Sequence, residues 1–314
     1  MMMRAALATL LATTALLGAP AAALAAGEVN LYTSRHYDTD ERLYSGFEAA
    51  TGIKINRIEG EADELLERIK TEGANSPADV FMTVDAGRVW RAQEAGIFSP
   101  VESPILEERI PEALQHPDNL WFGFSTRARL IFFSKDRVSN PPQTYAALAD
   151  PQYKGKICTR SGSNIYSLSL LASQIKHNGE EAATNWAKGI VANFAREPKG
   201  GDTDQLKAII SGECDIVVAN HYYFARGLAG GVEGLSAEIG KIGWVFPDQD
   251  GNGTHINTSA AGVLKTAPNR ENAIKLLQYL SSDLAQEYFA NGNNEYPAVA
   301  GASESAIAKK PWRI

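Results

Sequence analysis

The sequence predicts an α/β protein of two lobes with a hinge and an interlobe cleft, and three observations lead to this fold class. Patterns typical of strands and helices alternate from about residue 28 onward. This alternation implies right-handed crossovers and mainly parallel sheets. Two such units are separated by long extended segments, and the chain length fits two domains of ordinary size.

Residues 1–26 are expected to form a secretory signal peptide rather than part of the fold. Arg4 gives a short basic start, an apolar run follows over Ala5 to Leu17, and small residues allow cleavage after Ala25 or Ala26. This run is too short for a membrane anchor. No cysteine stands at the cleavage point, which argues against a lipid-anchored form. The mature protein is therefore expected to be secreted to the periplasm and soluble.

The charge of the chain excludes two classes of partner. Without Arg4, the formal net charge of −7 becomes −8. An acidic chain that lacks a basic stripe is a poor candidate for binding nucleic acid or an anionic membrane surface.

The first α/β unit is expected to contain three strand–helix pairs. The predicted elements are strand 28–34, helix 38–52, strand 53–59, helix 62–73, strand 78–84 and helix 86–96. Asp38 with Glu41 three residues later suggests a capping box at the start of the first helix, and Gly52 closes that helix. A proline-rich stretch over 100–117 is expected to be a loop, and a long extended segment follows over 120–134.

The second unit repeats the alternation. It is expected to contain strand 156–160, helices 163–177, 180–194 and 204–212, and strand 215–220. Beyond it, we expect a strand over 242–248, a glycine-rich turn, a strand over 259–265 and one amphipathic helix over 271–292.

Tyrosine and histidine recur where predicted strands give way to helices. His36 and Tyr37 follow the first strand, Tyr166 lies in the first helical turn after "SGSN", and Tyr222 and Tyr223 follow "CDIVVANH". Ligands of open α/β sheets bind beyond the carboxyl ends of strands, and clefts between domains are preferred sites. Any one of these tyrosines could simply be an amphipathic surface residue, but the set of them suggests a shared site.

A set of phenols in one cleft has a specific chemical meaning. A free phenol has a pKa near 10, so ionising several of them near neutral pH requires a strong positive charge. A hard trivalent cation prefers oxygen donors, whereas softer ions prefer imidazole and thiolate. Ferric iron is the best match to this set. Calcium would require carboxylates and carbonyl oxygens, and no "DxDxDG" loop occurs.

Several motifs carry a resemblance to a known family. The segments "LYTSRHY", "SPADVFMTVDAG", "WFGFSTRARLIFF", "CDIVVANHYY" and "NEYPA" together resemble the periplasmic ferric-ion-binding proteins of bacterial iron ABC transporters, also called bacterial transferrins. The resemblance runs from about Glu28 to beyond Tyr296. It implies the type II periplasmic binding protein fold and a monomer that delivers Fe³⁺ to an inner-membrane permease and its ATPase.

The lobe boundaries expected for this fold are discontinuous. Lobe 1 is predicted to comprise residues 27–127 and 253–303, and lobe 2 residues 128–252 and 304–314.

The resemblance also suggests which residues bind iron. Tyr222 and Tyr223 match adjacent tyrosine ligands of the family, and His36 matches a ligand found in many members. Together with Tyr37 and Tyr166, they resemble the tyrosine-rich branch best known from cyanobacteria. Members of another branch use a carboxylate after the "ADVF" strand and a synergistic anion. Here Val84 and Asp85 follow with no glutamate, so we expect no obligatory exogenous anion.

Arginines are expected in a surrounding shell. Four phenolates against Fe³⁺ leave a net charge of −1, which is costly in a closed cleft. Arg127 and Arg129 alternate along an extended segment, and Arg226 stands four residues after Tyr222. The resemblance favours Arg127 as the cleft arginine. Arg129 and Arg226 could instead be solvated or bridge the lobes, and Ser161 to Ser163 most simply cap a helix.

The two cysteines, Cys158 and Cys214, are expected to pair in an oxidising compartment, with two buried free thiols as the alternative. Each lies at or next to a predicted strand of the second unit. A single disulfide within one lobe is therefore plausible.

Two other functions remain open at this point. An enzyme is disfavoured because no "GxSxG", "HExxH" or P-loop motif occurs. A receptor for an organic solute, such as a polyamine, thiamine or a phosphonate, would use aromatic walls and carboxylates. The residues that leave this option open are Asp85, Trp90, Trp121 and Trp244.

Overall fold

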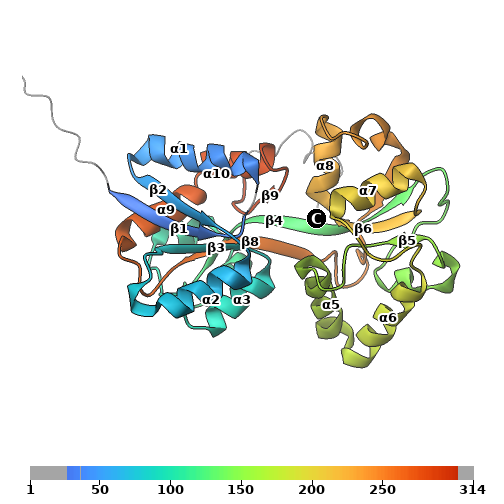
Figure 1. Ribbon diagram of the computed structural model, residues 1–314, viewed down its shortest axis with the longest axis horizontal. Coiled ribbons are helices and arrows are strands. Elements are labelled where there is room, and N and C mark those ends of the chain that lie inside the picture. The colour runs from blue at the N-terminus through green and yellow to red at the C-terminus, as the bar shows by residue number, and fades with distance from the viewer. Residues whose placement is uncertain (1–26, 36, 303–314) are drawn as a thin grey trace, which may run out of the picture.

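The computed structural model describes residues 27–302 except His36, and it shows two lobes side by side (Figure 1). The predicted signal peptide, the segment 304–314 assigned to lobe 2 and the candidate ligand His36 lie outside the described residues. Within these limits, the expected two-lobe α/β fold is confirmed. The exact lobe boundaries stay a prediction.

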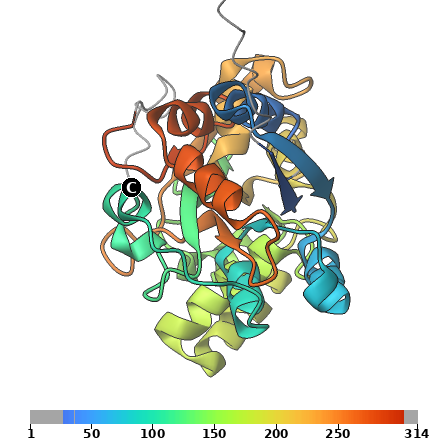
Figure 2. The same ribbon diagram turned by 90° about the vertical axis from the view of Figure 1, so that its left-hand side faces the viewer.

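The first lobe is built around a mixed sheet. Its central strands are β1 (Glu28–Thr33), β2 (Lys54–Glu59) and β3 (Val80–Val84), in the order β2-β1-β3, and β3 is followed by β8 (Ile256–Val263). Two groups of helices cover this sheet on opposite sides, as the two views show (Figures 1 and 2). They are α1 (Glu41–Thr51), α9 (Arg270–Leu280) and α10 (Asp283–Asn291), and α2 (Ala62–Glu72) and α3 (Ala86–Glu94).

The second lobe has a smaller sheet and its own helices. Strand β6 (Ile216–Asn220) pairs in parallel with β5 (Ile157–Cys158), and β7 (Ile242–Val245) joins on the side of β4 (Phe122–Ser134). The helices are α5 (Ile165–Asn178), α6 (Glu180–Ala192), α7 (Asp202–Ser211) and α8 (His221–Ala229).

Strand β4 belongs to both lobes. Its residues from Phe122 to Ala128 pair with β8, and those from Arg129 to Phe133 pair with β6. A short strand β9 (Tyr296–Pro297) also pairs with β4. Hydrophobic residues form separate clusters on either side of this crossing, so each lobe has its own core.

The direction of the strands differs from the mainly parallel sheets expected from the sequence. Among the strands that the structure describes, the parallel pairs are β1–β2, β1–β3 and β5–β6. Every pair made by β4 or β8 is antiparallel. These two strands run between the lobes in opposite directions, and such long-range connections leave no trace in local periodicity.

Three local predictions were wrong. The single helix expected over 271–292 is two helices, because Ser282 accepts a hydrogen bond from the Ala285 N–H (3.3 Å) and starts α10. The proline-rich loop contains helix α4 (Pro104–Arg109), which is capped by Ser103. Helix α1 begins at Glu41, after a 3₁₀ turn over Asp38–Asp40, and thus three residues later than expected.

The predicted disulfide between Cys158 and Cys214 is confirmed, and it joins the end of β5 to the residues before β6. Both cysteines are buried in the core of the second lobe. Among the described residues, we find no helix with the length and apolar character needed to span a membrane.

Removing this disulfide should destabilise the second lobe. The bridge closes a loop with a sequence separation of 56 residues, and a loop of that size restricts the unfolded chain by about 4 kcal/mol in the entropic model. We expect Cys158→Ser/Cys214→Ser to lose about 2–4 kcal/mol of unfolding free energy in urea under oxidising conditions. Unchanged stability relative to the wild type would contradict a structural role for the bridge.

Candidate functional site

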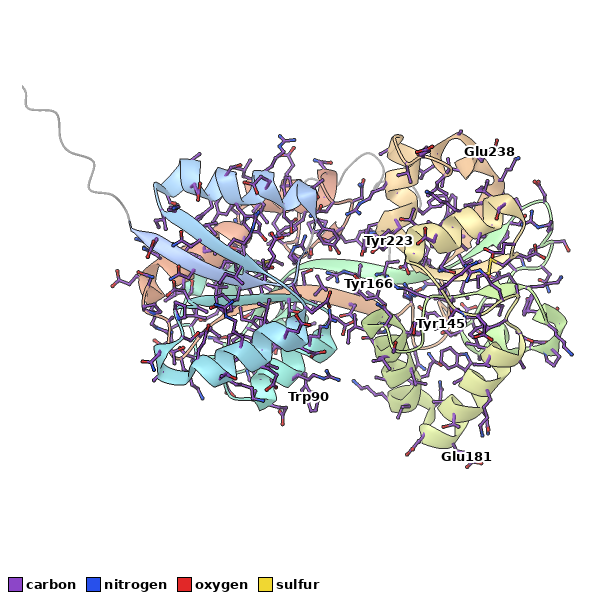
Figure 3. The ribbon with its side chains drawn as sticks, in the orientation of Figure 1. Trp90, Tyr145, Tyr166, Glu181, Tyr223 and Glu238 are labelled. Carbon is purple, nitrogen blue, oxygen red and sulfur yellow. A yellow bond between two sulfur atoms is a disulfide. The ribbon has the colours of Figure 1, made fainter. Side chains whose placement is uncertain are left out.

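The four candidate tyrosines lie where strands or loops give way to helices, at the face where the lobes meet. Tyr37 follows β1 and precedes the 3₁₀ turn of the first lobe. Tyr166 is the second residue of α5, and the side chain of Asn164 caps its N–H at 3.0 Å. Tyr222 and Tyr223 occupy the first turn of α8, directly after β6. Figure 3 shows Tyr166 and Tyr223 on the side of the second lobe that faces the first.

Their phenol groups converge. The hydroxyl oxygens of Tyr37 and Tyr222 lie 3.1 Å apart, although they come from different lobes. Those of Tyr166 and Tyr222 lie 3.4 Å apart, and the rings of Tyr222 and Tyr223 lie 4.2 Å apart between centroids. Tyr37, Tyr166 and Tyr222 are buried, and Tyr222 is completely inaccessible. The sequence prediction that these side chains would share one place therefore agrees with the geometry.

The phenols resist ionisation in this environment. Burial raises the pKa of Tyr37 and of Tyr222 well above 10, and the neighbouring phenols, Tyr166 foremost, raise both pKa values further. Burial likewise raises the pKa of Tyr223, with a further contribution from Tyr166. The positive charge of Arg127 opposes the increase at Tyr37 and Tyr222. These three phenols are thus neutral at pH 7 unless an additional positive charge arrives.

Arginines surround the phenol cluster. The guanidinium carbon of Arg226 lies 5.1, 5.2 and 5.7 Å from the ring centroids of Tyr37, Tyr222 and Tyr223. Arg35 lies 4.8 Å from the Tyr37 ring on the first-lobe side. In the second lobe, two arginines face the ring of Tyr166. The guanidinium carbon lies 5.0 Å from the ring centroid for Arg160 and 5.7 Å for Arg129. Arg127 adds charge from β4 without stacking.

Three buried carboxylates hold four of these arginines in place. Glu295 contacts Arg35 at 3.0 Å and Arg127 at 3.2 Å. Asp40 binds the Nε of Arg35 at 2.7 Å. Because Asp40 is engaged in this way, its side chain does not cap α1.

Asp202 plays the same part in the second lobe. It contacts Arg129 at 2.6 Å and Arg160 at 3.5 Å. Counting Arg226, five guanidiniums thus face three carboxylates, an excess of two positive charges around the phenols.

Arg127 reaches the phenol cluster from β4. Its side chain is completely buried, and it donates to the Oγ of Ser259 as well as contacting Glu295. Its position agrees with the sequence prediction of an arginine beside the site. Arg129 is also buried, which excludes the alternative that it is a solvated charge.

His221 and Asp85 are engaged elsewhere. His221 begins α8, its Nδ1 accepts the Ala128 N–H at 3.1 Å, and its ring stacks on Tyr296. Burial lowers the pKa of His221 to about 3. The carboxylate of Asp85 accepts the Gly87 N–H at 2.9 Å and caps α3. The side chains of both residues are therefore held by groups outside the phenol cluster.

Sequence reasoning missed the residues that orient the arginine shell. Arg35 and Arg160 each stand two residues after a strand, β1 and β5 respectively. The prediction considered only tyrosine, histidine and acidic residues at such strand ends. Glu295 and Asp202 carry no local signal, because their partners are 42 to 260 residues away in the chain. Applying the strand-end rule to charged residues would have found the two arginines.

The aromatic residues that an organic-solute site would use are not gathered at this place. Trp121 donates its Nε1–H to Gln93 within the first lobe at 3.0 Å, and Trp244 packs against the core of the second lobe. Trp90 is 58% exposed on α3 (Figure 3).

Acid should weaken the shell at Glu295. Burial alone would raise the pKa of this carboxyl group, but Arg35 and Arg127 lower it below its ordinary value of 4.5. The ion pairs therefore stabilise the fold above pH 4.5, and this stabilisation is lost as the pH falls through the lowered pKa.

Glu295→Gln should cost about 3–5 kcal/mol in unfolding free energy at pH 7, because it leaves two guanidiniums without their shared partner. Its difference from the wild type should shrink in acid, as measured by urea unfolding. The exposed Glu287→Gln on α10 serves as control. An equal loss in both variants would refute this account.

Comparisons with known proteins place the chain in a family. The family model described as "bacterial extracellular solute-binding protein" matches residues 75–312 of this chain. Iron uptake protein A1 of Synechocystis sp. is 55% identical over 87% of this chain and 76% of that protein.

Two solved structures have the same fold. A Trichodesmium FutA protein in complex with iron and citrate has a TM-score of 0.84 at 55% identity, with 90% of each chain covered. A ferric-binding protein from Campylobacter jejuni has a TM-score of 0.86 at 37% identity, again over 90% of each chain. The chain therefore belongs to the bacterial extracellular solute-binding proteins, in the family that includes the periplasmic ferric-ion-binding proteins.

Proposed function

We propose that this protein captures ferric iron between its lobes in the periplasm and delivers it to an ABC transporter. The observation that carries the proposal is the convergence of four phenol side chains from two lobes inside a ring of guanidiniums. The proposed ligands are the phenolate oxygens of Tyr37, Tyr166, Tyr222 and Tyr223, together with His36. Relatives with the same fold are named as iron uptake and ferric-binding proteins.

The chemistry of the donors suits a hard trivalent ion. Phenolate oxygens match Fe³⁺ better than they match zinc or copper, which prefer imidazole and thiolate. Among the described residues, no group of three or more histidine, cysteine, aspartate or glutamate side chains is arranged to hold a metal. A metal at the phenol cluster would have to supply the positive charge that these high-pKa groups need to ionise.

The arginine shell accounts for the charge of the loaded site. Four phenolates and Fe³⁺ together carry −1, and an isolated negative charge in a buried site is costly. The two excess positive charges of the shell offset it without an added anion. We therefore propose that an exogenous anion is not obligatory, and that Arg127 and Arg226 stabilise the phenolate form.

The distribution of ligands between the lobes suggests an order of binding. Tyr166, Tyr222 and Tyr223 belong to the second lobe and can meet the metal while the lobes are apart. Closure would then bring Tyr37 and His36 from the first lobe. The 3.1 Å contact between the Tyr37 and Tyr222 hydroxyls shows that the lobes reach each other at this point. Hinge closure of this kind would let a permease recognise the loaded form.

Release would follow from the reverse of these steps. Docking on the permease can favour the open form, and reduction to Fe²⁺ would weaken the match between hard ligands and a hard ion. The protein itself needs no catalytic group for either route, which agrees with its membership of a solute-binding family.

The first prediction of this proposal is optical. Titration of the metal-free protein with ferric citrate should produce a visible phenolate-to-iron charge-transfer band. Tyr223→Phe should weaken or abolish the band. Tyr37→Phe should only weaken it, because the tyrosine ligands of the second lobe are still present. Tyr279→Phe, which removes a half-buried hydroxyl of α9 far from the cluster, is the matched control.

Other outcomes would favour the competing functions. A protein that stays colourless but gains thermal stability with a polyamine, thiamine or a phosphonate would be a receptor for an organic solute. Turnover of a substrate by the iron-loaded protein would indicate an enzyme.

A second prediction concerns protons. Tyr37 has a raised pKa and is neutral at pH 7, so it must lose a proton when it binds iron, and acid must compete with binding. Affinity should fall by about tenfold per pH unit for each phenol proton released. Proton release measured in weakly buffered solution should be about one equivalent smaller for Tyr37→Phe than for the wild type. Equal release from both proteins would show that Tyr37 is not a ligand.

A further inference from the structure

The second lobe contains a large pocket that includes none of the four candidate tyrosines and shares Arg129 and Arg160 with the arginine shell. Its volume is 590 Å³, and it lies between α5, α6 and the segment that follows α6. Protein interiors are close-packed, with few voids larger than a water molecule. Sites for small organic ligands, in contrast, measure about 300–1,000 Å³. The size of this pocket therefore corresponds to a ligand site and not to a packing defect.

The floor of the pocket is apolar. Leu170, Ile190 and Val218, which line it, also belong to the core of the second lobe, and Trp186 and Phe194 complete the floor. The Nε1–H of Trp186 already donates to the carbonyl oxygen of Tyr145 at 2.6 Å. The indole therefore offers its face but no donor, and the floor suits an aliphatic or aromatic body.

The other end of the pocket carries positive charge. Arg129, whose side chain is 3% exposed, lines the pocket and uses its Nη1 for Asp202 and Asn220. Its Nε has no hydrogen-bond partner among the described residues, and neither has the Nε of Arg160. Both guanidiniums share the single carboxylate of Asp202. In the metal-free protein, one positive charge at this end is thus left without a counter-charge.

The rim, in contrast, is balanced in charge. Arg196, which also lines the pocket, shares Glu213 with Lys199, each at 3.0 Å. Glu197 is the one carboxylate among the lining residues, and it is exposed to solvent. Two cations thus face two carboxylates at the rim, and the excess of positive charge is confined to the end formed by Arg129 and Arg160.

We propose that this pocket binds a small amphipathic organic anion. A carboxylate or sulfonate head would accept from the guanidiniums of Arg129 and Arg160, and an aliphatic or aromatic body would lie on Leu170, Trp186 and Phe194. A neutral or cationic molecule of the same size would leave the excess charge unpaired. Binding at this pocket does not require that the protein carry iron.

The site is also adjacent to the phenol cluster. The same two arginines stack on the ring of Tyr166, at 5.0 and 5.7 Å. An anion bound in the pocket would thus be separated from that phenol by one layer of guanidinium groups.

The test uses the metal-free full chain and the fluorescent probe 8-anilinonaphthalene-1-sulfonate, an amphipathic organic anion. We expect saturable binding that decanoate displaces and that decyltrimethylammonium does not. Ala187 lines the pocket, so Ala187→Phe should weaken probe binding by about tenfold or more by filling it. Ala182→Phe, at an exposed position of the same helix, should leave binding unchanged.

A second pair of variants, which place opposite charges at the rim, tests the proposal even if Ala187→Phe fails to fold. Val191 lines the pocket and is 61% exposed, so either charged residue can be accommodated there. Val191→Glu should bind the probe about fivefold more weakly than Val191→Lys. The proposal is overturned if the probe does not saturate, if the cation displaces it as well as decanoate does, or if neither the filling variant nor the charge placed at Val191 changes binding.

Discussion

The packing of four phenol groups, three of them buried, beside an excess of guanidinium charge is the constraint on which the rest of this structure depends. Neutral phenols tolerate burial, whereas phenolates do not unless positive charge surrounds them. The shell of Arg35, Arg127, Arg129, Arg160 and Arg226 supplies part of that charge, but the pKa values of the buried phenols stay high. The arrangement is therefore poised to ionise only when a multivalent cation enters.

The fold serves this arrangement by placing helix starts at the junction of the lobes. Strand β4 passes from one sheet to the other, so residues of both lobes meet beside it. Glu295 and Asp202 then fix the arginines from opposite sides, one in each lobe. The ion pairs of Glu295 lie largely in the first lobe, and those of Asp202 lie in the second. The lobes can therefore move apart and close again without breaking these ion pairs, as hinge closure requires.

The tyrosines could be located from the sequence because their positions follow a local rule: each lies at a transition from strand or loop to helix. The pairing of Cys158 with Cys214 was likewise predictable from composition and compartment. Other features depend on partners distant in the chain. The antiparallel course of β4 and β8, for example, is a property of the assembled lobes. The break between α9 and α10 at Ser282 has a local cause, the helix cap of Ser282. It was missed because the helical spacing of apolar residues continues across it.

Anomalous diffraction at the iron absorption edge, from crystals of the iron-loaded protein, tests the central claim most directly. The account predicts one iron peak within bonding distance of the hydroxyl oxygens of Tyr37, Tyr166, Tyr222 and Tyr223. A peak at any other place, or an iron atom that leaves Tyr37 unbound while the lobes are closed, would contradict it.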